Sequence, residues 1–212
     1  MPELPDLEIL KEALESRILE RPIVSVRALR PGIMKTTTPP VDALSGRTFT
    51  GVSRRGKHLI LSLAPELHLV VHLMLAGRFV LCKSETKITK ATGLQVTFSD
   101  GEDLRLIENG SIKLVKVHVV IDPLEVSGVA SAGVEPLSSK FTVQLLKELG
   151  HGRRCHVKKL LTDQRAIAGI GSAYADEIMF AARISPVRYV STLSDDEFDC
   201  LHDAIVNVLS EA

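Results

Sequence analysis

The sequence has no long apolar run, no secretory leader and few cysteines. Its longest hydrophobic segments have the length of strands, too short for a membrane-spanning helix, so we expect no membrane partner. No basic segment followed by an apolar one opens the chain, so no secretory signal is expected. The cysteines (Cys82, Cys155 and Cys200) are far apart and odd in number, which argues against a disulfide framework and a CxxC metal site. We expect each to be a small buried side chain in a cytoplasmic protein.

The chain also lacks net charge, with 26 Lys and Arg against 26 Asp and Glu. This balance by itself argues against a nucleic-acid partner, but the charges are unevenly distributed. Residues 27–57 hold seven Lys or Arg against Asp42, and residues 151–165 hold five against Asp163. Residues 191–212 hold six acids and no Lys or Arg. The two basic stretches predict one anion-binding face in a common cleft, or else two solvated faces without a partner.

The hydrophobic pattern predicts a helix followed by many strands. Leu7, Leu10, Leu14 and Ile18 recur at helical spacing, and Pro5 suits the first turn, so we expect a helix over 5–20. Short alternating or apolar segments then follow one another, punctuated by Gly, Pro and Asp, which is typical of a β-sandwich or barrel. The expected strands are 23–29, 48–53, 57–63, 67–74, 78–82, 94–99, 103–107 and 112–121.

After the strands the pattern becomes helical. The stretch 122–139 is rich in small residues, Pro and Gly and has no period, which indicates a linker. The expected helices beyond it are 140–149, 154–167, 172–183 and 194–210. The sequence therefore predicts an α+β protein of two domains. These are an N-terminal β-sandwich with a leading helix (1–122), a linker (123–139) and an all-α domain (140–212).

The first residues suggest nucleophilic chemistry. Removal of Met1 would leave Pro2 with a free secondary amine, and an α-amino group titrates far below a lysine side chain. Amines attack carbonyl carbons to give Schiff bases, and a secondary amine gives a cationic iminium that accepts electrons during eliminations. Glu3 could donate a proton to a leaving or ring oxygen. A proline and an acid before a helix are also an ordinary start signal, so this alternative stays open.

Two further segments have the residue types of a phosphate site. Gly169 and Gly171 lie between two helical segments, with Ser172 as the expected N-cap, and a helix N-terminus offers unpaired N–H groups to an anion. Lys158 adds a cation about one helix earlier. Lys57 enters a strand after a basic turn, where it can contact phosphate or assist proton transfer. The alternative for the glycine segment is an ordinary helix hairpin stopped by glycine. The alternative for Lys57 is a solvated lysine at a strand edge.

Together these segments resemble the formamidopyrimidine-DNA glycosylase/endonuclease VIII family of base-excision repair enzymes. The family's Pro-Glu-Leu-Pro-Glu start is similar to 2–6, and its Arg-Gly-Lys turn is similar to 55–57. Its His-Leu-x-Met-Ser/Thr-Gly strand end and its Gly-x-Glu-Pro-Leu linker resemble 72–77 and 133–137. Its helix–two-turn–helix motif resembles 163–174. The segments follow the family order along the whole chain.

The resemblance implies a role for each matching residue. Pro2 would attack C1′ of a damaged nucleoside, Glu3 would handle protons at the sugar, and Lys57 would assist catalysis and bind phosphate. Asp6 would support them. The implied DNA-binding residues are His72, Leu75, Lys158, Gly169, Gly171, Ser172 and Tyr174. Such an enzyme extrudes the damaged nucleotide from the duplex before it reacts.

The chain departs from the family pattern at several positions. Asp6 replaces a Glu, Ser172 replaces an Asn, and Leu75 stands where a Met normally enters the space left by the flipped base. The family's Asp-x-Arg-Arg-Phe-Gly loop is missing, and 110–112 stand about there instead. Relatives continue into a finger that usually holds a Cys₄ zinc site. That site would lie beyond residue 212, so we expect no metal and no cofactor in this chain.

We therefore expect a bifunctional DNA glycosylase and abasic-site lyase that acts on damaged, oxidised bases in duplex, single-stranded or bubble DNA. It is expected to be a cytoplasmic monomer, associated with the nucleoid when bound to DNA. The first rival is a non-catalytic homologue that binds damaged or distorted DNA in the same cleft. The second is an unrelated helix-hairpin protein that binds structured RNA.

Overall fold

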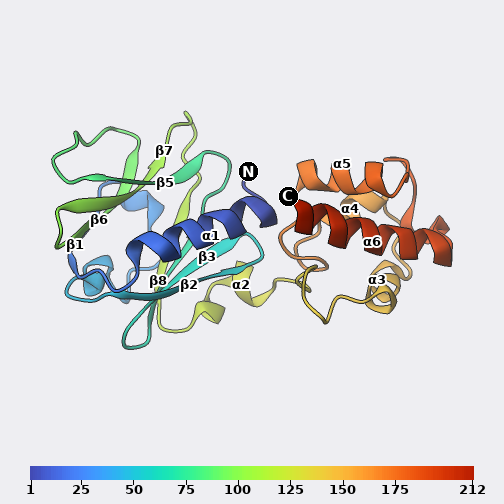
Figure 1. Cartoon of the computed structure of the whole chain (residues 1–212), viewed down its shortest axis with the longest axis horizontal. Coiled ribbons are helices and arrows are strands. Elements are labelled where there is room, and N and C mark those ends of the chain that lie inside the picture. Colours follow the sequence, from blue (N-terminus) through green and yellow to red (C-terminus); the bar gives the residue numbers. More distant parts are fainter. The chain divides into compact units, whose positions relative to one another are not determined.

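The computed structural model describes residues 1–212, which form two compact units (Figure 1). The β-sandwich unit comprises Met1–Pro2, Leu7–Arg54 and His58–Ala130. The helical unit comprises Glu3–Asp6, Arg55–Lys57 and Ser131–Ala212. Two short segments from early in the sequence therefore pack with the helices, which matters for the site described below.

The β-sandwich unit consists of two four-stranded sheets, ordered β1-β6-β7-β5 and β2-β3-β4-β8. The first is antiparallel throughout, and β4 pairs antiparallel with β3 and β8 in the second. The strands are β1 Ile23–Ala28, β2 Phe49–Arg55, β3 His58–Leu63, β4 Leu67–His72, β5 Gly77–Lys83, β6 Thr92–Phe98, β7 Glu102–Glu108 and β8 Lys116–Val120.

Alternation along these strands places the apolar side chains between the two sheets. Leu61 of β3 and Leu69 of β4 are paired and lie side by side on one face of their sheet. Both belong to the same buried core as Val96 and Leu104 of the other sheet. The leading helix α1 (Leu4–Ile18) buries Leu14 and Ile18 in this core. The short 3₁₀ helices η1 (Pro31–Ile33) and η2 (Val41–Leu44) add further apolar side chains.

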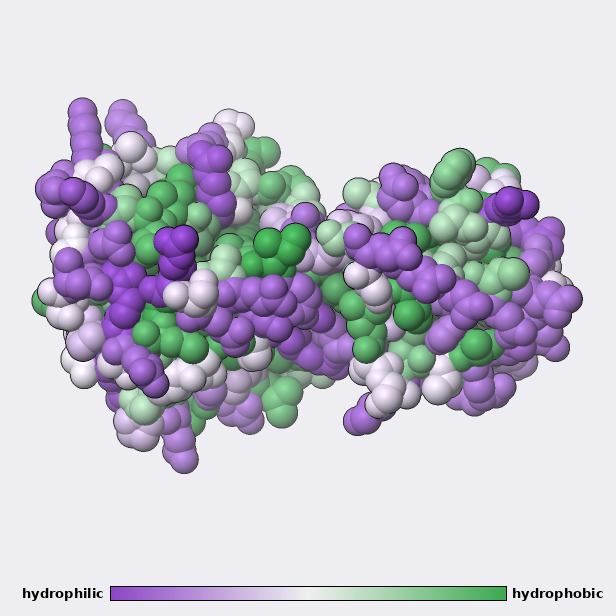
Figure 2. Space-filling view, viewed as in Figure 1, coloured by the Kyte–Doolittle hydropathy of each residue, from purple (hydrophilic) through white to green (hydrophobic).

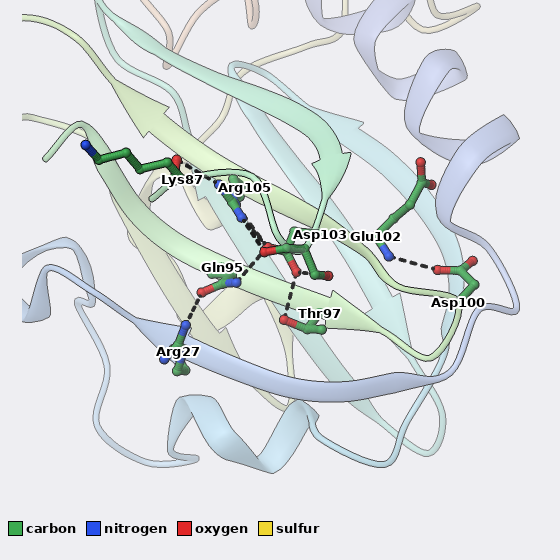
Figure 3. A network of polar contacts seen from close by, with 9 residues as sticks. Arg27, Lys87, Gln95, Thr97, Asp100, Glu102, Asp103 and Arg105 are labelled. Atoms are coloured by element: carbon green, nitrogen blue, oxygen red, sulfur yellow. Dashed lines mark hydrogen bonds and ion pairs between the residues drawn. The ribbon is translucent and has the colours of Figure 1, made fainter. Parts of the chain in front are cut away.

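The opposite face of the β6–β7 pair holds a buried polar cluster (Figure 3). Asp103 accepts hydrogen bonds from Arg105 (Nη2–Oδ2 2.6 Å), Gln95 (2.6 Å), Thr97 (2.9 Å) and Ser84 (2.8 Å). Arg105 also donates to the backbone carbonyls of Ser84 and Lys87 in the loop after β5. A buried carboxylate needs this many donors because burial removes its water. The cluster holds the 84–91 loop against the sheet.

The helical unit has four α-helices around one apolar core: α3 Val143–Gly150, α4 Val157–Thr162, α5 Ser172–Ala181 and α6 Asp195–Glu211, with η4 (Val190–Thr192) before α6. Ser194 caps α6 in a reciprocal arrangement with Glu197, in which each side chain accepts the other's backbone N–H. Leu4 is fully buried in this core. The two-domain α+β fold expected from the sequence is confirmed, with the β-sandwich preceding the helices.

Three expected elements differ from the structure. The helix expected over 154–167 covers only 157–162, because Val134 forms a bridge with Ile167 and accepts the backbone N–H of Ala168. The strand expected over 112–121 covers only 116–120. The stretch expected as a linker contains η3 (Pro123–Glu125) and α2 (Ser127–Ala130), whose Val129 packs on the outer face of the second sheet.

The expectation of buried cysteines is wrong: Cys200 is exposed, and Cys82 and Cys155 are half-buried. None of the helices combines the length and apolarity needed to cross a bilayer. The face seen in Figure 2 is largely hydrophilic and is interrupted by separate hydrophobic patches.

Candidate active site

The N-terminal segment is anchored on the first turn of α5. Glu3 is only 5% exposed, and its carboxylate accepts three backbone N–H groups. Oε2 accepts from Gly171 (2.6 Å) and Tyr174 (3.2 Å), and Oε1 accepts from Ala173 (3.0 Å). A carboxylate at this end satisfies the unpaired N–H groups and complements the helix dipole. Glu3, a residue 168 positions earlier, therefore caps α5.

Ser172 was expected to be the N-cap of α5, and this expectation is wrong. The N-cap is Gly171, and Ser172 is the first helical residue, with its side chain exposed. A Cβ atom at position 171 would overlap the carboxylate of Glu3. Glycine is therefore required here because the carboxylate occupies the space of a side chain.

The turn before α5 is held by a side chain and by the N-terminal segment. Gln164 accepts the backbone N–H of Gly169 (3.0 Å) and donates to the carbonyl of Ile170 (2.6 Å). The backbone N–H of Leu4 donates to the carbonyl of Gly169 (3.0 Å). Gly169 has a φ of +89°, and a Cβ there would lie 2.9 Å from that of Leu4. Both the backbone conformation and the close approach require glycine.

Asp6 lies at the start of α1, where its Oδ2 accepts the backbone N–H of Glu3 (2.9 Å). Aspartate therefore reaches the backbone despite being one methylene shorter than the family's glutamate. Tyr174 in α5 lies near these acids. Burial, followed by the charges of Asp6, Glu3 and Glu177, raises the pKa of its phenol.

Lys57 belongs to a turn that is also fixed to the helical unit. Gly56 adopts a φ of +54° and donates its N–H to Glu135 (2.7 Å), and Arg55 forms an ion pair with the same oxygen (3.1 Å). Lys57 itself is only 7% exposed. Burial lowers the pKa of its ammonium group, and the nearby charge of Glu3 opposes this shift. A lysine with a lowered pKa is a better base and nucleophile at neutral pH.

Many residues of the two basic stretches are paired within the protein. Lys158 contacts both oxygens of Asp176 on α5, each at 2.7 Å. Arg153 pairs with Asp163 (2.7 Å), Arg54 with Glu8 (2.8 Å), and Arg30 with Glu108 (2.6 Å). An anion that binds these side chains therefore competes with an internal carboxylate.

Of the expected site residues, eight belong to the helical unit: Glu3, Asp6, Lys57, Lys158, Gly169, Gly171, Ser172 and Tyr174. Pro2 precedes Glu3 directly and is half-buried. His72 and Leu75 lie at the end of β4 and in the turn that follows it, within the β-sandwich unit. Glu135 and Gln164 were not among the expected site residues, although both lie inside the segments 133–137 and 163–174 that resemble the family's motifs.

No group of three or more His, Cys, Asp and Glu side chains in the 212 residues can hold a metal ion. The chain's own residues therefore do not form the family's zinc site. The local chemistry consists of a carboxylate on a helix N-terminus, a buried amine and, next to the carboxylate, a proline.

Two family models match the chain. The formamidopyrimidine-DNA glycosylase N-terminal domain matches residues 1–109, and the formamidopyrimidine-DNA glycosylase H2TH domain matches residues 132–212. The formamidopyrimidine-DNA glycosylase of Moorella thermoacetica is 34% identical over 213 residues, which is 100% of this chain and 78% of the relative. That of Symbiobacterium thermophilum is 36% identical over 100% of this chain and 70% of the relative.

Solved structures of the Lactococcus lactis formamidopyrimidine-DNA glycosylase are also similar. Its complex with DNA containing an abasic (AP) site, not covalently bound, has a TM-score of 0.91 at 28% identity and covers 99% of this chain and 80% of that one. Its complex with DNA containing FAPY-dG has the same TM-score and identity. In these complexes the relative binds damaged DNA.

Proposed function

The chain belongs to the formamidopyrimidine-DNA glycosylase family, and on that premise we propose that it excises damaged bases from DNA and cleaves the resulting abasic site. Pro2 is the nucleophile, Glu3 moves protons at the sugar, and Lys57 assists and binds phosphate. The proposed substrate class is oxidised bases, and the damaged DNA bound by the L. lactis relative contains FAPY-dG. The observation that supports the proposal best is the anchoring of Glu3 on α5 beside Pro2.

The anchoring gives the reaction a fixed geometry. Because Glu3 is held by three backbone N–H groups, Pro2 starts from a defined backbone position instead of a frayed terminus. In the lyase step, the amine adds to C1′ of the abasic aldehyde and water leaves, which gives an iminium. The iminium accepts the electron pair when the C2′ proton is removed and the 3′ phosphate departs.

The first rival from the sequence is a non-catalytic protein that binds damaged DNA, and the state of the Pro2 nitrogen separates it from the enzyme. Met1 precedes Pro2, and within a Met1–Pro2 peptide the Pro2 nitrogen is a tertiary amide that cannot attack. Intact mass of the purified protein reports whether Met1 is removed. A chain that keeps Met1 is expected to bind damaged DNA without forming a covalent adduct.

Borohydride trapping on DNA with an abasic site tests the enzymatic proposal, because borohydride reduces the iminium to a stable amine. We expect efficient trapping by the chain without Met1 and strongly reduced trapping by Pro2→Gly, which keeps only a primary amine. Lys57→Gln is the matched variant, since it removes the buried side-chain amine of the site and leaves the N-terminal amine in place. If Pro2→Gly is trapped as well as the native chain and Pro2→Gly/Lys57→Gln is not, the nucleophile is Lys57 and the assignment to Pro2 is refuted.

A further inference from the structure

The turns between α4 and α5 hold the N-terminal segment through two peptide groups. The carbonyl of Gly169 accepts the backbone N–H of Leu4 (3.0 Å), and the N–H of Gly171 donates to Oε2 of Glu3 (2.6 Å). The second bond is the shortest of the three that Glu3 accepts. Because Pro2 is joined directly to Glu3, a rotation of either peptide group would also turn the Pro2 nitrogen.

The side-chain amide of Gln164 fixes the turn that contains these groups. Its Oε1 accepts the N–H of Gly169 (3.0 Å), and its Nε2 donates to the carbonyl of Ile170 (2.6 Å). Nε2 also donates to the carbonyl of Thr162, the last residue of α4 (3.0 Å). The amide therefore uses its oxygen and both of its N–H groups, and the three bonds tie the end of α4 to the turns before α5.

Gln164 and Glu3 bind opposite ends of one peptide group. The carbonyl of Ile170 and the N–H of Gly171 belong to the same planar unit, so they point in opposite directions and move together. The donor at the carbonyl therefore sets the direction of the N–H that Glu3 accepts. A carbonyl that accepts a hydrogen bond also polarises its peptide group, which makes the N–H a stronger donor.

The Ile170 carbonyl has no second donor. Ile170 is buried, and no backbone N–H donates to its carbonyl. A buried carbonyl without a donor is costly, so loss of the amide would favour rotation of this peptide group toward water. That rotation would take the N–H of Gly171 away from Glu3.

We propose that Gln164 is a positioning residue for the cleavage of the abasic site. By holding the Ile170–Gly171 peptide group, it fixes the carboxylate of Glu3 and so the direction from which the Pro2 amine approaches C1′. Gln164 forms its own hydrogen bonds with the turns and not with Glu3, so it acts only through this peptide group. The inference rests on the proposed function. A misplacement of about 1 Å at a reacting group can slow a reaction about a hundredfold.

Two variants remove the donor at the Ile170 carbonyl in different ways. Gln164→Leu removes it at every pH and keeps a similar size. Gln164→Glu keeps it only while the new carboxyl group is protonated, because its O–H can then donate to Ile170 while its other oxygen accepts from Gly169. The ionised carboxylate has no donor, and the carbonyls of Thr162 and Ile170 repel it. Since they disfavour the charged form, its pKa should lie above the usual value of about 4.3.

The measurement is single-turnover cleavage of DNA with an abasic site from pH 5 to pH 8, by the chain without Met1. The protein is saturating, so DNA affinity does not contribute to the rate. We expect Gln164→Leu to be about thirtyfold slower than the native chain at every pH. Gln164→Glu should be about thirtyfold slower at pH 8 and within about threefold at pH 5. The matched control is Gln144→Glu, an exposed glutamine on α3, which should follow the native rate throughout.

A loss of folding is separated from a loss of positioning by circular dichroism at each pH, and rates are compared only between fully folded samples. If a variant unfolds, trimethylamine N-oxide is added to every sample, because it favours the folded state without supplying the missing donor. Two results would each overturn the proposal. One is a ratio of native to Gln164→Glu rates that stays constant from pH 5 to pH 8, and the other is a Gln164→Leu rate within about threefold of the native rate.

The native chain separates this inference from the proposed function. If the native chain without Met1 does not cleave the abasic site, the proposed function fails, and the role of Gln164 fails with it. If the native chain cleaves and both Gln164 variants behave like Gln144→Glu, the proposed function stands and only the positioning role is refuted.

Discussion

Replacing Glu3 is expected to lower the stability of the folded protein as well as its catalytic activity. The carboxylate is buried and accepts three backbone N–H groups at the N-terminus of α5, at 2.6, 3.0 and 3.2 Å. Hydrogen bonds to a charged group contribute about 1.5–3 kcal/mol each, but three bonds to one carboxylate do not add fully. Water can reach the exposed Ala173 in the variant and recover part of the loss. For Glu3→Ala we therefore expect a decrease of about 3 kcal/mol in the free energy of unfolding.

Glu3→Gln should cost less, about 1 kcal/mol, because its amide oxygen can still accept from the N–H groups of Gly171 and Tyr174. Its NH2 group then faces the N–H of Ala173, so only that hydrogen bond is lost. The measurement is urea unfolding at neutral pH, followed by far-ultraviolet circular dichroism. The matched control is Glu12→Ala, an exposed glutamate on α1, which should change stability by less than about 0.5 kcal/mol. If Glu3→Ala is no more destabilised than Glu12→Ala, the reasoning that Glu3 caps α5 is refuted. Activity losses of Glu3 variants should be compared only at equal folded fractions.

Two further predictions concern the ion pairs of each unit. Lys158→Ala should lower the slope of log affinity against log salt for DNA by about one, since one phosphate contact is lost. Asp176→Asn should strengthen DNA binding, because it removes the carboxylate charge that pairs with Lys158. An unchanged salt slope in Lys158→Ala would show that this lysine contacts no phosphate. Burial alone would raise the pKa of Asp103, but the hydrogen bonds from Arg105, Ser84, Thr97 and Gln95 lower it below its usual value. Its contribution to stability is therefore complete above the unfolded pKa of about 3.9 and is lost as the pH falls from there through the lower pKa of the folded state. Asp103→Ala should cost about 3–5 kcal/mol at neutral pH and flatten the acid limb of the stability curve measured by urea unfolding, and an unchanged limb would contradict this.

The order and type of most elements follow from local patterns in the sequence. Apolar residues at helical spacing predicted α1, and alternation predicted the strands, because each period matches a face that must be buried. Gly169 and Gly171 marked the turn before α5, because glycine interrupts a helical pattern and permits the backbone of a turn. The motifs placed the chain in its family because they occur in the family's order.

Only the tertiary structure decided which distant residues complete each site. Glu3 takes the place of a local N-cap on α5, since the space beside Gly171 is filled by a carboxylate from the other end of the chain. The segment around Ile167 leaves the helical pattern because it pairs with Val134, and the loop after β7 leaves the strand pattern because the buried Glu108 binds its backbone. These contacts join residues far apart in sequence or depend on burial. Local periodicity describes one segment at a time. It therefore contains no information about contacts between distant segments or about how deeply a side chain is buried.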